Sequence, residues 1–162
     1  MKKLMLMLAM TLALTLTANM ARADDWDDAV VAYRNGDYAT AFNLFKPLAE
    51  QGNAKAQHNL GIMYENGYGV MEDDNEAVTW YRKSARQGIA VSQYNLGLMY
   101  NLGIGIDINN KKALMWYNLA HDHNNSYAEY SINKLVLRMT PANISQAQDM
   151  AERCLASNYQ DC

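Results

Sequence analysis

The amino-acid sequence predicts an all-α solenoid built from helix-turn-helix repeats. Residues 56–64 and 92–100 can be superimposed at an offset of 36, and the same offset relates Trp80-Tyr81 to Trp116-Tyr117. Within each copy, apolar residues recur every three or four positions, as they do along one face of an α-helix. A self-repeat of this length is typical of stacked helical units, because each unit buries its apolar face against the next.

The first 23 residues predict a secretory signal peptide rather than part of the fold. Lys2 and Lys3 precede an apolar run over residues 4–18, and the small residues of Ala21-Arg22-Ala23 suit cleavage after Ala23. The alternative is an uncleaved anchor, but a run of roughly 15 residues is shorter than the ~20 needed to span a bilayer. We therefore expect a periplasmic or secreted protein with no stable membrane insertion.

The charge balance narrows the class of partner. The chain of 162 residues has 14 Lys and Arg against 17 Asp and Glu, a formal net charge of -3. Cleavage after Ala23 would remove Lys2, Lys3 and Arg22, leaving 11 basic and 17 acidic residues and a net charge of -6. Nucleic-acid phosphates need a surplus of Lys and Arg, so nucleic acid is not expected as a partner.

The rest of the chain divides by the 36-residue period. Residues 24–53 are expected to hold an N-terminal capping helix and half a repeat, and residues 54–88 and 89–123 two full repeats. Residues 124–139 are expected to form a degenerate repeat helix, and residues 140–162 a C-terminal capping helix with a cysteine pair. End repeats are atypical because they close the stack with a polar face.

Each full repeat is expected to be a pair of helices. In the first repeat the two packed stripes are Ala56, Leu60, Met63 and Tyr64, then Ala77, Trp80, Tyr81 and Ser84. Gly61 lies inside the first helix, where glycine costs about 1 kcal/mol against alanine, so we expect the second helix to cross closely there. Gly67 and Gly69 supply the positive φ angles that end the first helix, and Asp73 or Asp74 can cap the second. The second repeat has the same devices at Gly97, Gly103, Gly105 and Asn109.

These motifs resemble the Sel-one-like repeat (SLR) family, relatives of the tetratricopeptide repeat. The family pattern is roughly A-x-A-Q-x-x-L-G-x-M-Y-x-x-G-x-G-V-x-x-D, followed by A-x-x-W-Y-x-x-A-A-x-x-G, and residues 54–88 keep nearly all of it. The second copy departs from the pattern at Ser92, Ile106 and Asn109. The resemblance implies an α/α superhelix that binds partners through its concave side.

The C-terminal segment is predicted to form a final helix that reaches about Ser157. Thr140 suits the N-cap and Pro141 the first helical position. The segment is similar to the capping helix that ends many secreted bacterial SLR proteins. Cys154 and Cys162 are the only cysteines of the sequence, and an even count in an exported chain favours a disulfide. Free or intermolecular thiols and a redox role are the alternatives, although the spacing is not C-x-x-C.

The expected concave wall is the face of each first helix that lies opposite its packed stripe. Steps of 36 along this face give the rows His58/Tyr94/Tyr130 and Trp26/Ile62/Leu98/Lys134, with Glu65 and Asn101 beside them. Aromatic and apolar side chains on a face that should meet water predict a groove that binds a protein or peptide. The alternative is that a tight superhelix or the terminal helices bury these side chains.

Other groups in the sequence are weaker candidates for chemistry. Ser131 and Lys134 have the S-x-x-K spacing of serine β-lactamases, but the companion S-D-N and K-T-G motifs are absent from the sequence. His121 and His123 are two positions apart, so on a helix they cannot share one metal ion. The acidic clusters near residues 24–28 and 72–74 lack the spacing of a calcium loop. We expect no metal site and no cofactor.

The sequence therefore predicts an exported, non-catalytic repeat scaffold that binds a protein or peptide partner through its concave face. The chief alternative is a cell-wall-active protein that binds or hydrolyses peptidoglycan fragments or β-lactams. A third hypothesis is a structural subunit of an envelope assembly.

Overall fold

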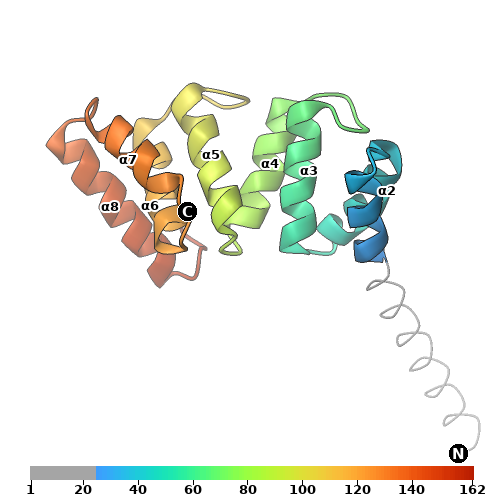
Figure 1. Cartoon of the computed structure of the whole chain (residues 1–162). Coiled ribbons are helices and arrows are strands. Elements are labelled where there is room, and N and C mark those ends of the chain that lie inside the picture. The colour runs from blue at the N-terminus through green and yellow to red at the C-terminus, as the bar shows by residue number, and fades with distance from the viewer. Residues whose placement is uncertain (1–24) are drawn as a thin grey trace, which may run out of the picture.

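The computed structural model describes residues 25–162, and the predicted signal peptide lies outside the described residues. This part of the chain is a stack of helices, which follow one another from α2 at one end to α8 at the other (Figure 1). A helix over residues 25–34 precedes α2 (Tyr38–Glu50), α3 (Ala54–Asn66), α4 (Asp74–Ala85), α5 (Ala90–Leu102), α6 (Asn110–Asp122), α7 (Ala128–Val136) and α8 (Pro141–Ala156). The predicted all-α solenoid is confirmed.

The helices pack as the repeat predicts, in pairs that lean on their neighbours. α3 packs against α4 to form the first full repeat, and α5 packs against α6 to form the second. α2 packs against α3, and α4 against α5, which joins the repeats into one stack. At the C-terminal end, α7 and α8 both pack against α6. We call α3, α5 and α7 the first helices, and α4, α6 and α8 the second helices.

The helix ends are fixed by the residues that the sequence indicates. Gly67 and Gly103 end α3 and α5 with φ angles of 67° and 73°, in the left-handed region that glycine adopts without strain. The Asp73 carboxylate accepts hydrogen bonds from the backbone N–H groups of Asn75 and Glu76 at the start of α4. Asn109 caps α6, and Thr140 caps α8 with Pro141 in its first turn.

The two helical glycines mark where the helices of each repeat cross. A Cβ on Gly61 would lie 2.5 Å from Cδ1 of the Tyr81 ring, and one on Gly97 would lie 2.6 Å from Cδ1 of Tyr117. No real methyl group approaches a ring carbon so closely. The close crossing predicted from the cost of glycine in a helix is therefore confirmed.

The apolar core has two clusters, and α4 contributes to both. The N-terminal cluster includes Phe45, Leu60, Met63 and Trp80, whereas Tyr81, the next residue, belongs to the C-terminal cluster. Trp116 also lies in the C-terminal cluster and is 1% exposed, against 7% for Trp80. The Trp-Tyr dipeptide of the first repeat therefore packs into both clusters, with Trp80 in one and Tyr81 in the other.

The last residues of the chain fold back onto the C-terminal ends of α4 and α6. Cys154 and Cys162 are joined at disulfide distance, with their Cα atoms 5.1 Å apart. The Tyr159 hydroxyl lies 3.0 Å from Nε2 of His123 at the end of α6. The Arg86 guanidinium donates to the Cys162 carbonyl oxygen at 3.2 Å. The C-terminus accordingly lies beside α6 rather than beyond α8 (Figure 1).

Candidate functional site

The predicted rows on the first helices begin with His58 on α3. Its Nδ1 atom lies 2.9 Å from the Ser92 hydroxyl oxygen on α5, and its ring packs near Tyr81. Burial lowers the pKa of His58 from 6.5 to about 4. The side chain is thus a neutral link between the two repeats near neutral pH.

Glu65 lies at the other end of α3, where it accepts a hydrogen bond from the Tyr81 hydroxyl. Burial is the main cause of the raised pKa of Tyr81, and the Glu65 carboxylate raises it further. A hydrogen bond with Asn95 of α5 acts in the opposite direction and lowers the pKa of Tyr81. The Tyr81 hydroxyl is therefore held between the first helices of the two full repeats.

The second repeat places different groups at the equivalent positions, each 36 residues later. Tyr117 replaces Tyr81, Asn101 replaces Glu65 and Ser131 replaces Asn95. The Tyr117 hydroxyl is buried and makes no hydrogen bond within residues 25–162. Burial raises the pKa of Tyr117 to about 12, while the nearby Asn101 and Ser131 oppose the increase. This phenol therefore lies beside polar groups without a carboxylate to receive its proton.

Side chains of α5 and α7 meet above the Tyr117 phenol. The Tyr94 hydroxyl lies 3.3 Å from Oγ of Ser131, and the Arg138 guanidinium donates to Oδ1 of Asn101 at 3.0 Å. The Lys134 ammonium lies 5.5 Å from the centre of the Tyr130 ring. We call this region the α5–α7 surface and define it by Tyr94, Leu98, Asn101, Tyr130, Lys134 and Arg138.

The exposure of these side chains varies along the α5–α7 surface. Tyr130 is 68% exposed, and Leu137 at the end of α7 is 83% exposed. Tyr94 and Leu98 are half-buried against the C-terminal cluster, as is Ile62 on α3. Part of the predicted row therefore contributes to packing, while its C-terminal part meets solvent.

Trp26 occupies a different environment from the other predicted residues. It packs edge-on against Phe45, with ring centres 5.5 Å apart, at the N-terminal cluster. Only residues 35–37 connect its helix to α2, whereas residues 67–73 connect α3 to α4. The buried Ala29 and Ala32 match Leu60 and Met63, which lie 31 residues later. The step of 36 used to place Trp26 in a row with Ile62 therefore does not extend to this helix.

Sequence reasoning missed two members of the arrangement, Arg138 and Tyr117. Arg138 lies four residues after Lys134, a spacing that puts two cations on one helical face, and this signal could have identified it. Tyr117 belongs to the packed stripe of its helix, and the direction in which its hydroxyl points follows only from the helix crossing at Gly97. The S-x-x-K spacing predicts a nucleophilic role for Ser131, whereas in the structure its hydroxyl contacts the Tyr94 hydroxyl.

The histidine pair and the acidic clusters do not form a metal centre in the described part of the chain. His121 is exposed, whereas Nδ1 of His123 lies 3.0 Å from Oε1 of Gln93. Among residues 25–162, no three His, Cys, Asp or Glu side chains are grouped so that they could hold a metal ion. Asp73 serves instead as the cap of α4.

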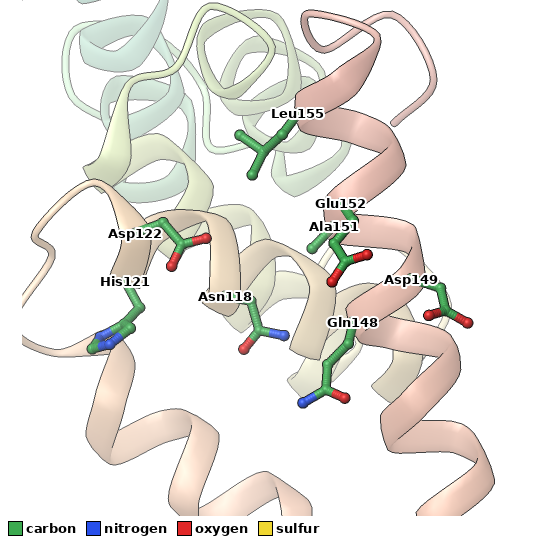
Figure 2. Close-up of a pocket in the computed structure, with 8 residues that line it drawn as sticks. All are labelled: Asn118, His121, Asp122, Gln148, Asp149, Ala151, Glu152 and Leu155. Carbon is green, nitrogen blue, oxygen red and sulfur yellow. The ribbon is translucent and has the colours of Figure 1, made fainter.

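A separate polar groove lies between the second helices α6 and α8 (Figure 2). Its volume is about 430 Å³, and Gln148 and Glu152 extend from α8 toward α6. The lining residues are Asn118, His121, Asp122, Gln148, Asp149, Ala151, Glu152 and Leu155. Because only second helices line it, this groove is not part of the α5–α7 surface.

In the described range, residues 25–162, none of the helices combines the length and the apolar character needed to traverse a lipid bilayer.

The paired helices and the 36-residue period define the class of the protein, an α/α repeat solenoid. The protein-family model described as Sel1 repeat matches residues 31–53, 54–89 and 90–125, which together make up more than half of the chain. The chain therefore belongs to the Sel1 repeat family, and the resemblance found in the sequence is confirmed.

Two solved structures share this fold. One is a protective antigen present in uropathogenic Escherichia coli strains and displaying an SLR fold; it matches with a TM-score of 0.79 and 24% identity, over 85% of this chain and 31% of that chain. The other is a Sel1 repeat protein from Oxalobacter formigenes, with a TM-score of 0.65 and 34% identity, over 68% of this chain and 46% of that chain.

Two curated relatives match over a shorter stretch. The rat DAP3-binding cell death enhancer 1 is 42% identical over 45 residues, 28% of this chain and 9% of the relative. The mouse protein of the same name is 40% identical over 45 residues, with the same shares. The chain thus spans about a tenth of the length of these relatives, and less than half of each matched structure.

Proposed function

We propose that this protein is an exported, non-catalytic scaffold that binds a protein or peptide through the concave face formed by its first helices. The observation that carries the proposal is the α5–α7 surface, where Tyr130 and the adjoining Leu137 are strongly exposed beside the half-buried Tyr94 and Leu98. Exposed aromatic and aliphatic side chains next to polar groups are typical of a recognition surface. Membership of the Sel1 repeat family supports a role in protein interaction.

Export rests on two observations outside this surface. The N-terminal sequence has the three parts of a signal peptide, and the two cysteines lie at disulfide distance. Disulfides persist in oxidising compartments such as the periplasm and are rare in the cytosol. Both observations favour a protein that works outside the cytoplasm.

The contacts of Ser131 and Lys134 favour binding over catalysis. A nucleophilic serine needs a base within hydrogen-bond reach, at about 2.6–3.2 Å. The Ser131 hydroxyl lies against the Tyr94 hydroxyl instead, and the Lys134 ammonium lies over the Tyr130 ring. We therefore assign the S-x-x-K spacing to the recognition surface and not to a β-lactam or peptidoglycan hydrolase.

Site-specific photo-crosslinking in the native compartment tests the proposal. A photoreactive phenylalanine analogue at position 130 should yield a discrete adduct, whereas the same analogue at Thr79, exposed on α4, should not. Tandem mass spectrometry of the adduct identifies the partner and the crosslinked residue. Equal adducts from both positions, or an adduct from position 79 alone, would place recognition on another surface.

A further inference from the structure

Each full repeat has a buried tyrosine hydroxyl at the same position, but the hydrogen bonding of the two hydroxyls differs. This difference points to the chemistry of the partner. In the first repeat, the Tyr81 hydroxyl donates to the Glu65 carboxylate. In the second repeat, the Tyr117 hydroxyl is fully buried and makes no hydrogen bond within residues 25–162. Asn101 stands in place of the glutamate, and its Oδ1 accepts a hydrogen bond from Arg138. An unpaired buried hydroxyl is costly, so its presence calls for an explanation. The second repeat has the phenol donor without the carboxylate acceptor.

The α5–α7 surface carries two cations, and one of them, Arg138, lies beside Asn101, where the carboxylate is missing. The Arg138 guanidinium binds the amide oxygen of Asn101, and the Lys134 ammonium lies over the Tyr130 ring, so both cations contact neutral groups. α5, which forms the other side of the surface, contains no charged residue. Glu129 lies in the first turn of α7, whereas Lys134 and Arg138 lie at its C-terminal end. On a chain whose formal net charge is -3, this end of α7 is a local cationic region beside apolar side chains.

We propose that the α5–α7 surface binds an acidic peptide segment of the partner, whose carboxylate pairs with Arg138 beside Asn101, the residue that replaces Glu65 in the second repeat. This inference rests on the proposed function and names the chemical class of its ligand. Arg138 receives the carboxylate with N–H groups that remain after its bond to Asn101, since a guanidinium has five. Lys134 adds a second charge-assisted contact, and the Tyr94 and Ser131 hydroxyls lie within the same cluster.

The apolar neighbours select a mixed segment rather than a purely acidic one. Tyr130 and Leu137 are exposed on the α7 side, and Leu98 is half-buried on the α5 side. Apolar residues that flank the ligand carboxylate can cover these side chains and exclude water from the charged contacts. Such exclusion strengthens an ion pair that would contribute little if it were fully exposed.

Fluorescence anisotropy with three matched labelled peptides tests this assignment on the signal-cleaved, full-length protein. The peptides carry leucine and tyrosine at shared positions and glutamate, glutamine or lysine at the alternating ones. We expect the glutamate peptide to bind about tenfold more tightly than the glutamine peptide, as hydrogen bonds to charged groups allow. Binding should weaken as salt is raised.

Charge variants locate the binding site. Lys134→Gln and Arg138→Gln together should remove the preference for glutamate, and Arg138→Glu should shift it toward the lysine peptide. Arg153→Gln is the matched control, because Arg153 is an exposed cation on α8. Thermal unfolding monitored by circular dichroism shows that the variants fold, which is expected because the changed side chains are exposed.

A third variant tests the internal comparison directly. Asn101→Glu gives the second repeat the carboxylate that the first repeat has, within reach of both Tyr117 and Arg138. It should reduce binding of the glutamate peptide about tenfold by occupying its site, while Asn101→Gln should not. The thermal midpoint of Asn101→Glu should equal or exceed that of the natural protein.

The outcomes separate this inference from the proposed function. If the glutamine peptide binds as tightly as the glutamate peptide, the surface still binds peptides but does not select acid, and the inference is overturned. The inference also fails if none of the three peptides binds. In those cases, crosslinking at position 130 still decides whether the surface binds a protein.

Discussion

The first full repeat (α3–α4) and the second (α5–α6) share their packing but differ in the polar contacts of their first helices. In both, a glutamine on the first helix donates to a carbonyl oxygen of the preceding helix: Gln57 to Ala49 at 3.0 Å and Gln93 to Ala85 at 3.2 Å. At other positions of the same helices the two repeats differ: His58 and Glu65 in the first correspond to Tyr94 and Asn101 in the second, 36 residues later.

This contrast separates the residues that build the solenoid from those that we propose for partner recognition. A residue at a helix crossing must satisfy the same geometry in every copy, so glycine and the Trp-Tyr dipeptide recur. A residue on the face of a first helix that lies opposite its packed stripe contacts only the next helix or solvent. Such a residue can differ between repeats while the helices stack in the same way. We therefore expect the proposed binding to depend on the positions that differ between the repeats.

The largest expected effect tests the packing that the repeats share. Trp116→Ala should lower the free energy of unfolding by about 3–5 kcal/mol, as for large aromatic residues removed from a core. Trp80→Ala should cost less, because Trp80 is 7% exposed against 1% for Trp116 and its ring is already covered on one face by Lys83. Urea denaturation measures both. An unchanged midpoint for Trp116→Ala would contradict the assigned register.

The next effect is confined to the first repeat, because His58 has no histidine counterpart in the second. Its pKa is about 4 in the folded protein and near 6.5 when unfolded, so the unfolded state binds the proton first. Stability that is present above pH 6.5 should therefore fall by up to about 3 kcal/mol as the pH is lowered to 4.

His58→Gln removes this titration while keeping a group able to bond Ser92. Its free energy of unfolding should fall less steeply than that of the natural protein between pH 6.5 and pH 4. His121→Gln is the control, because His121 is exposed and should leave the pH dependence unchanged. Parallel curves for the natural protein and the His58→Gln variant would show that His58 is accessible to protons in the fold.

A third effect concerns the C-terminal tail, which contacts Arg86 at the end of the first full repeat and His123 at the end of the second. Breaking the Cys154–Cys162 link should cost about 2.5 kcal/mol in the chain-entropy treatment of so short a loop. Cys162→Ser is the appropriate variant, because Cys154 is fully buried and its replacement would also disturb α8. Urea denaturation with and without reductant should give the same difference. Two thiols alkylated in the native protein without reductant would contradict the link.

The sequence predicts the features of this fold that depend on local chemistry. Gly67 and Asp73 have one physical reason each for their places, a positive φ angle and a helix cap, and both lie where the pattern puts them. The period of 36 predicts the pairing of helices, because each period contains the turn and cap residues that end one helix and begin the next. It fails for Trp26, because a constant step assumes a constant loop, and the first connection is shorter.

The candidate site was less predictable because it depends on distances between helices. A periodic pattern shows which residues share a face, but not whether two faces are close enough for Asn101 to meet Arg138. It also cannot show that Tyr94 and Leu98 are half-buried rather than free in a groove. Their role in binding stays a prediction. Substitution at the exposed Tyr130 tests binding on this surface with less disturbance of the fold than substitution at Tyr94 or Leu98.

The smallest effects bear most directly on the difference between the repeats. Removing the hydroxyl in Tyr81→Phe leaves the half-buried Glu65 carboxylate without its donor, which should cost about 1.5–3 kcal/mol. Tyr117→Phe deletes a buried hydroxyl that has no partner within residues 25–162, so it should change stability by less than about 0.5 kcal/mol or increase it. The two variants remove the same atom from equivalent positions, so urea denaturation compares their environments directly. Equal losses of stability would show that the Tyr117 hydroxyl has a hydrogen-bond acceptor of its own. The buried tyrosine hydroxyls of the two repeats would then both be hydrogen-bonded, although the surrounding residues differ.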